Sequence, residues 1–154
     1  MPESAVLADV IITSVWSSDL SDLAATLTAA GLPADDIDEP GRTFLRFKDA
    51  AGHTVGFGGW ESHGADILLR SITVASDLRG QGLGGRIVEK VLGEAHAAGA
   101  SKAYLLTTSA QGFFAGQGFE VITRDAIPTS ILETRQAAGL CPTSAVIMVK
   151  KLSP

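Results

Sequence analysis

Apolar residues recur along the chain with two different spacings. The clearest helical stripe is formed by Ile87, Val88, Val91, Leu92 and Ala95, with charged residues on the remaining positions. Shorter runs rich in β-branched and aromatic residues, bounded by Gly, Pro, Asp and Ser, are typical of strands. Together the patterns predict strands over 10–15, 43–48, 54–60, 67–74, 102–108, 119–124 and 144–152, and helices over 20–30, 87–95, 110–117 and 128–138.

The order of these elements mixes hairpins with helical crossovers. We therefore expect a mixed α/β fold in which a central sheet of about six to seven strands, part antiparallel and part parallel, is flanked by helices. The segment 31–41 carries three Asp, one Glu and two Pro, which indicates a surface loop or an irregular short helix. A length of 154 residues fits a single domain over 1–154.

Composition narrows the class of function. The chain is 45% hydrophobic and 19% charged, with a net charge of −5, which argues against a nucleic-acid binder. A single cysteine, Cys141, rules out an intrachain disulfide and indicates a cytoplasmic protein. The longest apolar stretch falls short of the ~20 residues of a membrane span, so we expect no membrane association and, from the motifs below, no metal.

A glycine-rich segment lies between the strand 67–74 and the amphipathic helix. Glycines let the backbone turn sharply and leave its amides open, and the helix that follows adds unpaired N–H groups and the positive end of its dipole. This arrangement suits a pyrophosphate, although a plain tight turn is an alternative. The segment consists of Arg79, Gly80, Gln81, Gly82, Leu83, Gly84 and Gly85.

The same glycines also spell the dinucleotide fingerprint GxGxxG. That fingerprint opens a βαβ unit and is followed about 20 residues later by an acidic residue. Here the corresponding strand ends at 105–109 without an acid, and three or more strands precede the glycines. The dinucleotide interpretation is therefore disfavoured.

Two spaced motifs carry a resemblance to a known family. Arg79, Gly82 and Gly84 match the pattern Q/R-x-x-G-x-G/A, and 72–74 matches the L-x-V strand end before it. A second pattern, A-x-x-F-Y-x-x-x-G-F, is matched downstream by Ala110, Phe113, Gly118 and Phe119. Both patterns belong to the GNAT superfamily of N-acetyltransferases, which the chain resembles over roughly 10–152 and most strongly over 67–119.

The resemblance implies how a cosubstrate would bind. In GNAT enzymes the fourth and fifth strands splay apart, often with the help of a β-bulge on the fourth. The pantetheine of acetyl-CoA lies between them and pairs with main-chain groups, here those of Ile72, Thr73 and Val74. A backbone N–H near Val74 would stabilise the thioester oxyanion.

The family's general acid, a tyrosine, is replaced by Phe114. We expect Phe114 to line the cofactor site, with Ser109 or a water taking the place of the acid. General acid catalysis is worth about 10²–10⁴-fold, so the replacement does not exclude turnover. It does favour a second hypothesis, in which the chain is a non-catalytic acyl-CoA sensor.

A narrower resemblance points to the arsenic-resistance branch of the superfamily. The segments 69–84, 104–108 and 140–146 look like that branch. The reaction expected from it is acetyl transfer from acetyl-CoA to a primary amine of a small molecule, such as an amino acid or an arsenic- or phosphorus-containing analogue. A homodimer is left open.

Several polar residues are candidates for the acceptor side. Glu61, at the end of the third strand, could receive the amine proton directly or through water, the alternative being a solvated strand-end glutamate; His63 is a second candidate base. Arg70 interrupts an apolar strand, so it either meets an anionic acceptor or forms a structural ion pair.

Cys141 is either a small buried hydrophobe or a thiol near the acceptor, one that could meet trivalent arsenic. We assign Trp16 and Trp60 to packing.

Overall fold

A computed structural model describes residues 11–14, 20–32, 34–75, 82–132 and 145–152. Within these ranges seven strands form one sheet, in the order β1-β2-β3-β4-β5-β7-β6. The pair β4–β5 is parallel and its neighbours are antiparallel, which confirms the expected mixed sheet. The strands are β1 (Ile11–Ser14), β2 (Arg42–Lys48), β3 (Thr54–His63), β4 (Asp66–Val74), β5 (Lys102–Thr107), β6 (Glu120–Ile122) and β7 (Val146–Lys151).

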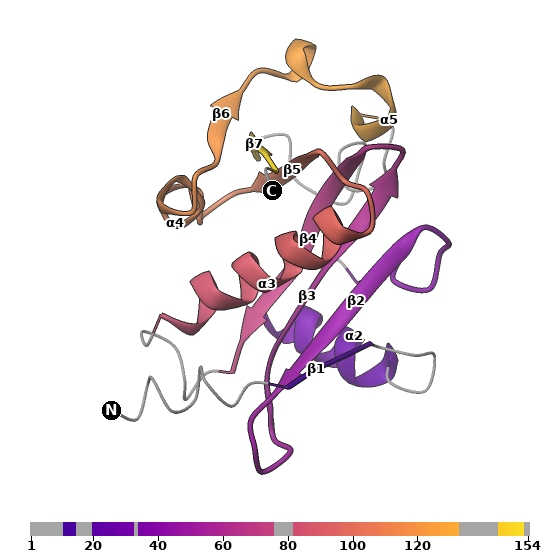
Figure 1. The fold of residues 1–154 in the computed structure, drawn as a ribbon, viewed down its shortest axis with the longest axis vertical. Helices are drawn as coiled ribbons and strands as arrows, with labels where there is room; N and C mark the ends of the chain where they lie inside the picture. The colour runs from indigo at the N-terminus through magenta and orange to yellow at the C-terminus, as the bar shows by residue number, and fades with distance from the viewer. Residues whose placement is uncertain (1–10, 15–19, 33, 76–81, 133–144, 153–154) are drawn as a thin grey trace.

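Helices cover both faces of the sheet. Figure 1 shows α3 (Leu83–Ala97) crossing the face turned to the viewer and α2 (Leu20–Ala29) behind the strands. The main apolar cluster lies under α3, and a smaller one, with Leu23, Leu27 and Phe57, lies under α2. The remaining elements are α4 (Gln111–Gly116), the 3-10 turn η3 (Arg124–Ala126) and α5 (Thr129–Leu132).

The predicted elements are all present, with ends shifted by a few residues. The helix predicted over 128–138 is described only as α5, and its remainder lies outside the described residues. The prediction for 31–41 was wrong in one respect. The segment is irregular, as expected, but Asp36 and Ile37 within it are buried, because Ile37 joins the apolar cluster under α2 and Asp36 meets arginines of the sheet.

The sheet parts between β4 and β5. The two strands pair only from Asp66 to Leu68 on β4, after which β4 pairs with β3 alone and β5 with β7 alone. The β3–β4 register also shifts: Phe57 faces Thr73 whereas Gly59 faces Arg70. Two residues of β4 therefore oppose one of β3, which defines a β-bulge at the point where β4 leaves β5.

Glycines on β3 let α3 approach the sheet. A Cβ at Gly56 would lie 2.3 Å from the Thr73 carbonyl oxygen and 2.5 Å from Ile87 Cδ1. At Gly58 it would lie 2.6 Å from Val91 Cγ2. The helix that follows the glycine-rich segment is thus seated directly on the backbone of β3.

Gly56→Ala should destabilise the protein by about 1–3 kcal/mol, because the added methyl meets backbone that cannot yield. Urea denaturation followed by circular dichroism measures the change. Gly93→Ala is the matched control, since a Cβ there meets nothing within 4 Å and helix propensity should add about 0.5–1 kcal/mol. Equal stability of the two variants would contradict the close seating of α3.

Candidate functional site

The N-terminus of α3 lies at the open end of the gap between β4 and β5. Gly82 caps the helix in the left-handed region with φ 78, no side chain bonds the cap, and the first turn contains no acidic residue. Leu83 is buried and anchors this end in the core. The first amides of a long helix are therefore kept clear of competing side-chain oxygens, as anion binding requires. Arg79, Gly80 and Gln81 lie outside the described residues.

The end of β4 meets α3 and α4 around a single glycine. A Cβ at Gly84 would lie 3.4 Å from the Phe113 ring and 3.6 Å from Val74 Cγ2. Ile72 and Val74 are half-buried and pack against the main cluster, and the Thr73 hydroxyl oxygen accepts a hydrogen bond from the Phe57 N–H at 3.2 Å. Hence Ile72 and Val74 lie against the core under the glycine-led helix, whereas the Thr73 side chain is bonded to β3. Gly85, next in the helix, faces the Gln117 side chain.

Phe113 and Phe114 have different surroundings. Phe114 is buried in the main cluster, with its ring centroid 4.9 Å from that of Phe113 and 5.8 Å from that of Phe119. Phe113 is 39% exposed and lies against Gly84. Ser109 is exposed in the turn after β5. The ring of Phe113 thus lies beside the glycine-led helix, whereas the sequence analysis named Phe113 only as a motif residue and assigned the cofactor contact to Phe114.

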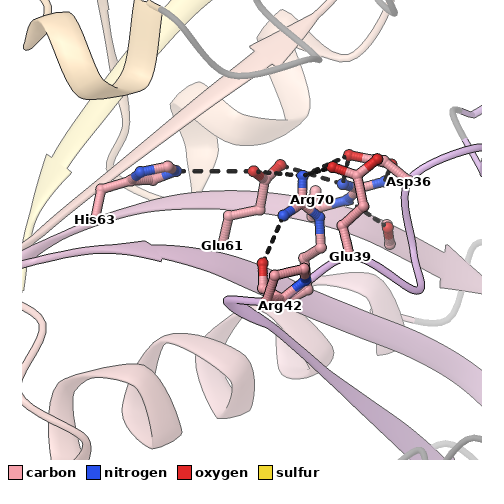
Figure 2. A network of polar contacts seen from close by, with 8 residues as sticks. Asp36, Glu39, Arg42, Glu61, His63 and Arg70 are labelled. Carbon is pink, nitrogen blue, oxygen red and sulfur yellow. Dashed lines mark hydrogen bonds and ion pairs between the residues drawn. The ribbon is translucent and has the colours of Figure 1, made fainter.

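A network of four charged side chains, of which Asp36, Glu61 and Arg70 are buried and Arg42 is 10% exposed, lies on the α2 face of the sheet (Figure 2). Arg70 Nη1 and Nη2 donate to the two carboxylate oxygens of Asp36 at 2.7 and 2.8 Å, and Nη1 also donates to Glu61 at 3.1 Å. Arg42 Nη2 lies 3.0 Å from Asp36 and 3.2 Å from Glu61. Each carboxylate therefore contacts both guanidinium groups, and each charge is compensated where water is excluded.

The two arginines control the ionisation of Asp36. Burial alone would raise the pKa of this carboxyl group, but hydrogen bonds and charges from Arg70 and Arg42 outweigh burial, and its pKa lies below its ordinary value. Asp36 is consequently a carboxylate at neutral pH. Sequence reasoning missed both Asp36 and Arg42, since nothing in the acid-rich segment 31–41 marks one Asp as buried.

The alternatives left open for Arg70 can be compared with this geometry. Its guanidinium fork is filled by Asp36, its side chain is 1% exposed, and it lies 5.6 Å from the centroid of the Phe44 ring. The structural ion pair is present. An acceptor carboxylate or arsonate would have to displace Asp36 to reach the same fork.

Glu61 and His63 lie near the C-terminal end of β3, and their side chains are on the same face of the sheet as this network. The nearest His63 nitrogen, Nε2, is 3.7 Å from Glu61 Oε1, and Figure 2 shows the ring directed at that carboxylate. Among the residues with described positions, His63 Nε2 and Arg42 Nε are buried without a hydrogen-bond partner. Buried groups of this kind usually mark the place of a water or ligand, and both belong to residues in contact with Glu61.

The other expected residues divide between core and undescribed segments. Trp60 is buried in the main cluster, whereas Trp16 and Cys141 lie outside the described residues. In the part of the chain with described positions, no cluster of three His, Cys, Asp or Glu side chains has the arrangement of a metal site. No helix in that part is long and apolar enough to cross a membrane.

Asp36→Asn should remove stability that depends on pH. A carboxyl group whose pKa is lowered by folding stabilises the native state above its unfolded pKa of about 3.9, and this contribution is lost as the pH falls through the native pKa. At pH 7 the variant should lose about 3–5 kcal/mol, because buried Arg70 and half-buried Arg42 lose a shared charged partner. The deficit should shrink below about pH 4.

Denaturation with urea from pH 3 to 8 measures this difference. Asp38→Asn is the matched control, because Asp38 lies in the same segment and is exposed. A deficit that does not change with pH would contradict the assigned ionisation of Asp36.

Comparison with known proteins shows which family shares this sequence pattern. A family profile described as an acetyltransferase (GNAT) domain matches residues 40–121, more than half of the chain. This span contains the bulged strand, the parting of β4 and β5, and the glycine-led helix.

Solved structures share the fold at low sequence identity. A GNAT-family acetyltransferase from Staphylococcus aureus Mu50 is 18% identical, with a TM-score of 0.74, and the match covers 94% of this chain and 99% of that one. N-acetylglutamate synthase from Neisseria gonorrhoeae, complexed with coenzyme A and N-acetyl-glutamate, is 19% identical with a TM-score of 0.77, over 94% of this chain and 35% of that one. An aminoglycoside 6'-N-acetyltransferase complexed with coenzyme A is 18% identical with a TM-score of 0.69, over 94% and 98%.

These three structures support the architecture, and the profile match supports the family. The parting strands, the bulge on β4 and the uncapped, glycine-led α3 are arranged as the two sequence motifs implied. The chain belongs to the GNAT acetyltransferase family and is an acyl-CoA-dependent N-acetyltransferase.

Proposed function

We propose that this protein transfers the acetyl group of acetyl-CoA to a primary amine of a small molecule. The observation that carries the proposal is the parting of β4 from β5 directly beside the N-terminus of α3. Beyond Leu68 the main chain of β4 has no β5 partner within the described residues, and α3 adds amides at its end. A thioester with a phosphorylated tail has complementary groups at both places.

The residues present fit acetyl-CoA. Amides at Gly82, Leu83 and Gly84 would hold pyrophosphate oxygens, and Arg79, which matches the family motif, would act with Gly80 and Gln81 on the same phosphates. Ile72, Thr73 and Val74 would pair with the pantetheine, and Phe113 would cover it beside Gly84. When bound, acetyl-CoA supplies the activated acetyl thioester.

Glu61 is the proposed proton acceptor on the amine side. It is held by Arg42 and Arg70, and the unpartnered nitrogens of Arg42 and His63 provide the polar surroundings in which a bridging water could carry the proton. Since the α-amine of an amino acid has an ordinary pKa of about 7.7–8.0, a weak base is sufficient. This favours an amino acid or a zwitterionic analogue over a lysine-type amine.

The narrower proposal is an acceptor that contains arsenic or phosphorus. It is supported by the segments 69–84, 104–108 and 140–146, which look like the arsenic-resistance branch. Cys141, within the third segment, is proposed to lie near the acceptor. Arg70 would bind an anionic acceptor only where that acceptor takes the place of Asp36, whose carboxylate occupies the guanidinium fork.

One observation favours a second candidate, an acyl-CoA sensor without turnover. Phe114 is buried in the core and has no hydroxyl group that could donate a proton to the leaving thiolate. Free-thiol release from acetyl-CoA, measured with a panel of amino acids, polyamines and amino-arsonates, separates the two candidates. An enzyme releases thiol with at least one amine, whereas a sensor binds acetyl-CoA and releases none.

Gly82→Glu should abolish acetyl-CoA binding, because its carboxylate would lie among the amides that face phosphate and would repel it. Titration calorimetry measures the affinity. Gly31→Glu is the matched control, since Gly31 has a similar φ of 72, ends α2 and has open space around it. Near-normal affinity in folded Gly82→Glu would refute the phosphate assignment.

Glu61→Gln should lower kcat/KM more at pH 6.5 than at pH 9, because an amine that is already deprotonated needs less help from a base. The profile is recorded with the best acceptor of the panel. Glu120→Gln, an exposed change on β6, serves as control. An equal loss at all pH values would show that Glu61 only positions the acceptor.

A further inference from the structure

Ser71 has a backbone conformation that its side chain disfavours. Its φ is 63, the one positive φ of a non-glycine residue in the described part of the chain. Left-handed backbone is strained for a residue that carries a Cβ, and such strain persists where the surrounding structure imposes it, often at functional sites. Here the surroundings are the β-bulge, in which Ser71 and Ile72 together oppose Gly58 of β3.

The hydroxyl group of Ser71 is fixed from one side. Arg70 Nε donates a hydrogen bond to Ser71 Oγ at 3.2 Å. A guanidinium nitrogen only donates, so the serine oxygen accepts and its own O–H remains a donor. Across the described residues nothing accepts that proton, although Ser71 is 7% exposed. The guanidinium polarises the O–H and so makes it a stronger donor.

Ser71 lies where the two strands part. The last β4 residue paired with β5 is Leu68, and Ser71 follows three residues later, one position before the strand end 72–74 expected to hold pantetheine. A donor with a free proton therefore lies at the inner end of the proposed cosubstrate gap. Arg70 in turn is held by Asp36 and Glu61, so the orientation of the hydroxyl group depends on the acceptor-side network.

We propose that the Ser71 hydroxyl group donates a hydrogen bond to the thioester carbonyl oxygen as that oxygen becomes an oxyanion. The inference rests on the proposed acetyl transfer. The amine nitrogen attacks the carbonyl carbon, the C–N bond forms and the π pair moves to oxygen. Collapse of the intermediate breaks the C–S bond and releases CoA as thiolate, while the amine proton passes to water or Glu61. Ser71 keeps its proton throughout.

Ser71→Gly tests the proposal, because glycine removes the hydroxyl group and accepts the left-handed backbone at no cost. Loss of one preorganised oxyanion donor should lower kcat by about 10²–10³-fold. The Kd for acetyl-CoA and the shape of the pH profile should stay as in the wild type. The melting temperature should not fall. Ser71→Asn, which tolerates this backbone and carries N–H donors, should recover part of the loss.

Ser62→Gly, at an exposed position of β3, is the matched control and should keep wild-type kcat. Ser71→Ala provides a second variant without a donor, should the glycine variant not fold. A kcat within threefold of wild type in either folded variant overturns the proposal, as does a loss confined to the Kd for acetyl-CoA. If wild-type protein acetylates no amine of the panel, the proposed function fails and this inference with it.

Discussion

The placement of the acceptor side depends on one buried interaction, the bidentate ion pair of Arg70 with Asp36. A guanidinium inside a sheet is tolerated only where carboxylates compensate its charge. The pair therefore draws the irregular segment 31–41 onto the α2 face of β4 and holds it there. Glu61 and Arg42 complete the set from β3 and β2, so that charge adds to the apolar contacts of Ile37 in joining these four parts of the chain.

This network also ties the acceptor side to the cosubstrate side. Arg70 is the last residue of β4 before the bulge, and it bonds the strained Ser71 through its remaining nitrogen. The gap between β4 and β5 opens at the same level. On the far side of the bulge the surface is built from backbone, glycine and aromatic carbon, at Gly82, Gly84 and Phe113.

That contrast explains what the sequence could predict. The cosubstrate surface depends on glycines at fixed spacing and on a helix with a clear apolar stripe, and both are visible in the sequence; the mixed sheet followed from the order of the elements. The acceptor side depends on long-range pairs such as Arg70 with Asp36, 34 residues apart. Three Asp in one segment offered no sign of which would be buried. The position of the bulge was equally hidden in the sequence. The residue with a positive φ is Ser71, and a glycine would be expected there.

The three-residue ladder between β4 and β5 has a mechanical consequence. Strands β1 to β4 form one half-sheet and β5, β7 and β6 the other, and in the described part of the chain the backbone bonds that join them lie between Ala65–Leu68 and the start of β5. Beyond that ladder, apolar side chains of α3, β4 and β5 in the main cluster link the halves. Hydrogen-bonded ladders fix the spacing of strands at ~4.8 Å, whereas side-chain packing follows the volumes of the residues that fill it. The spacing of the two halves beyond the ladder is therefore set by the volumes of the core side chains, and a substitution there can change it without altering the polar groups that line the gap.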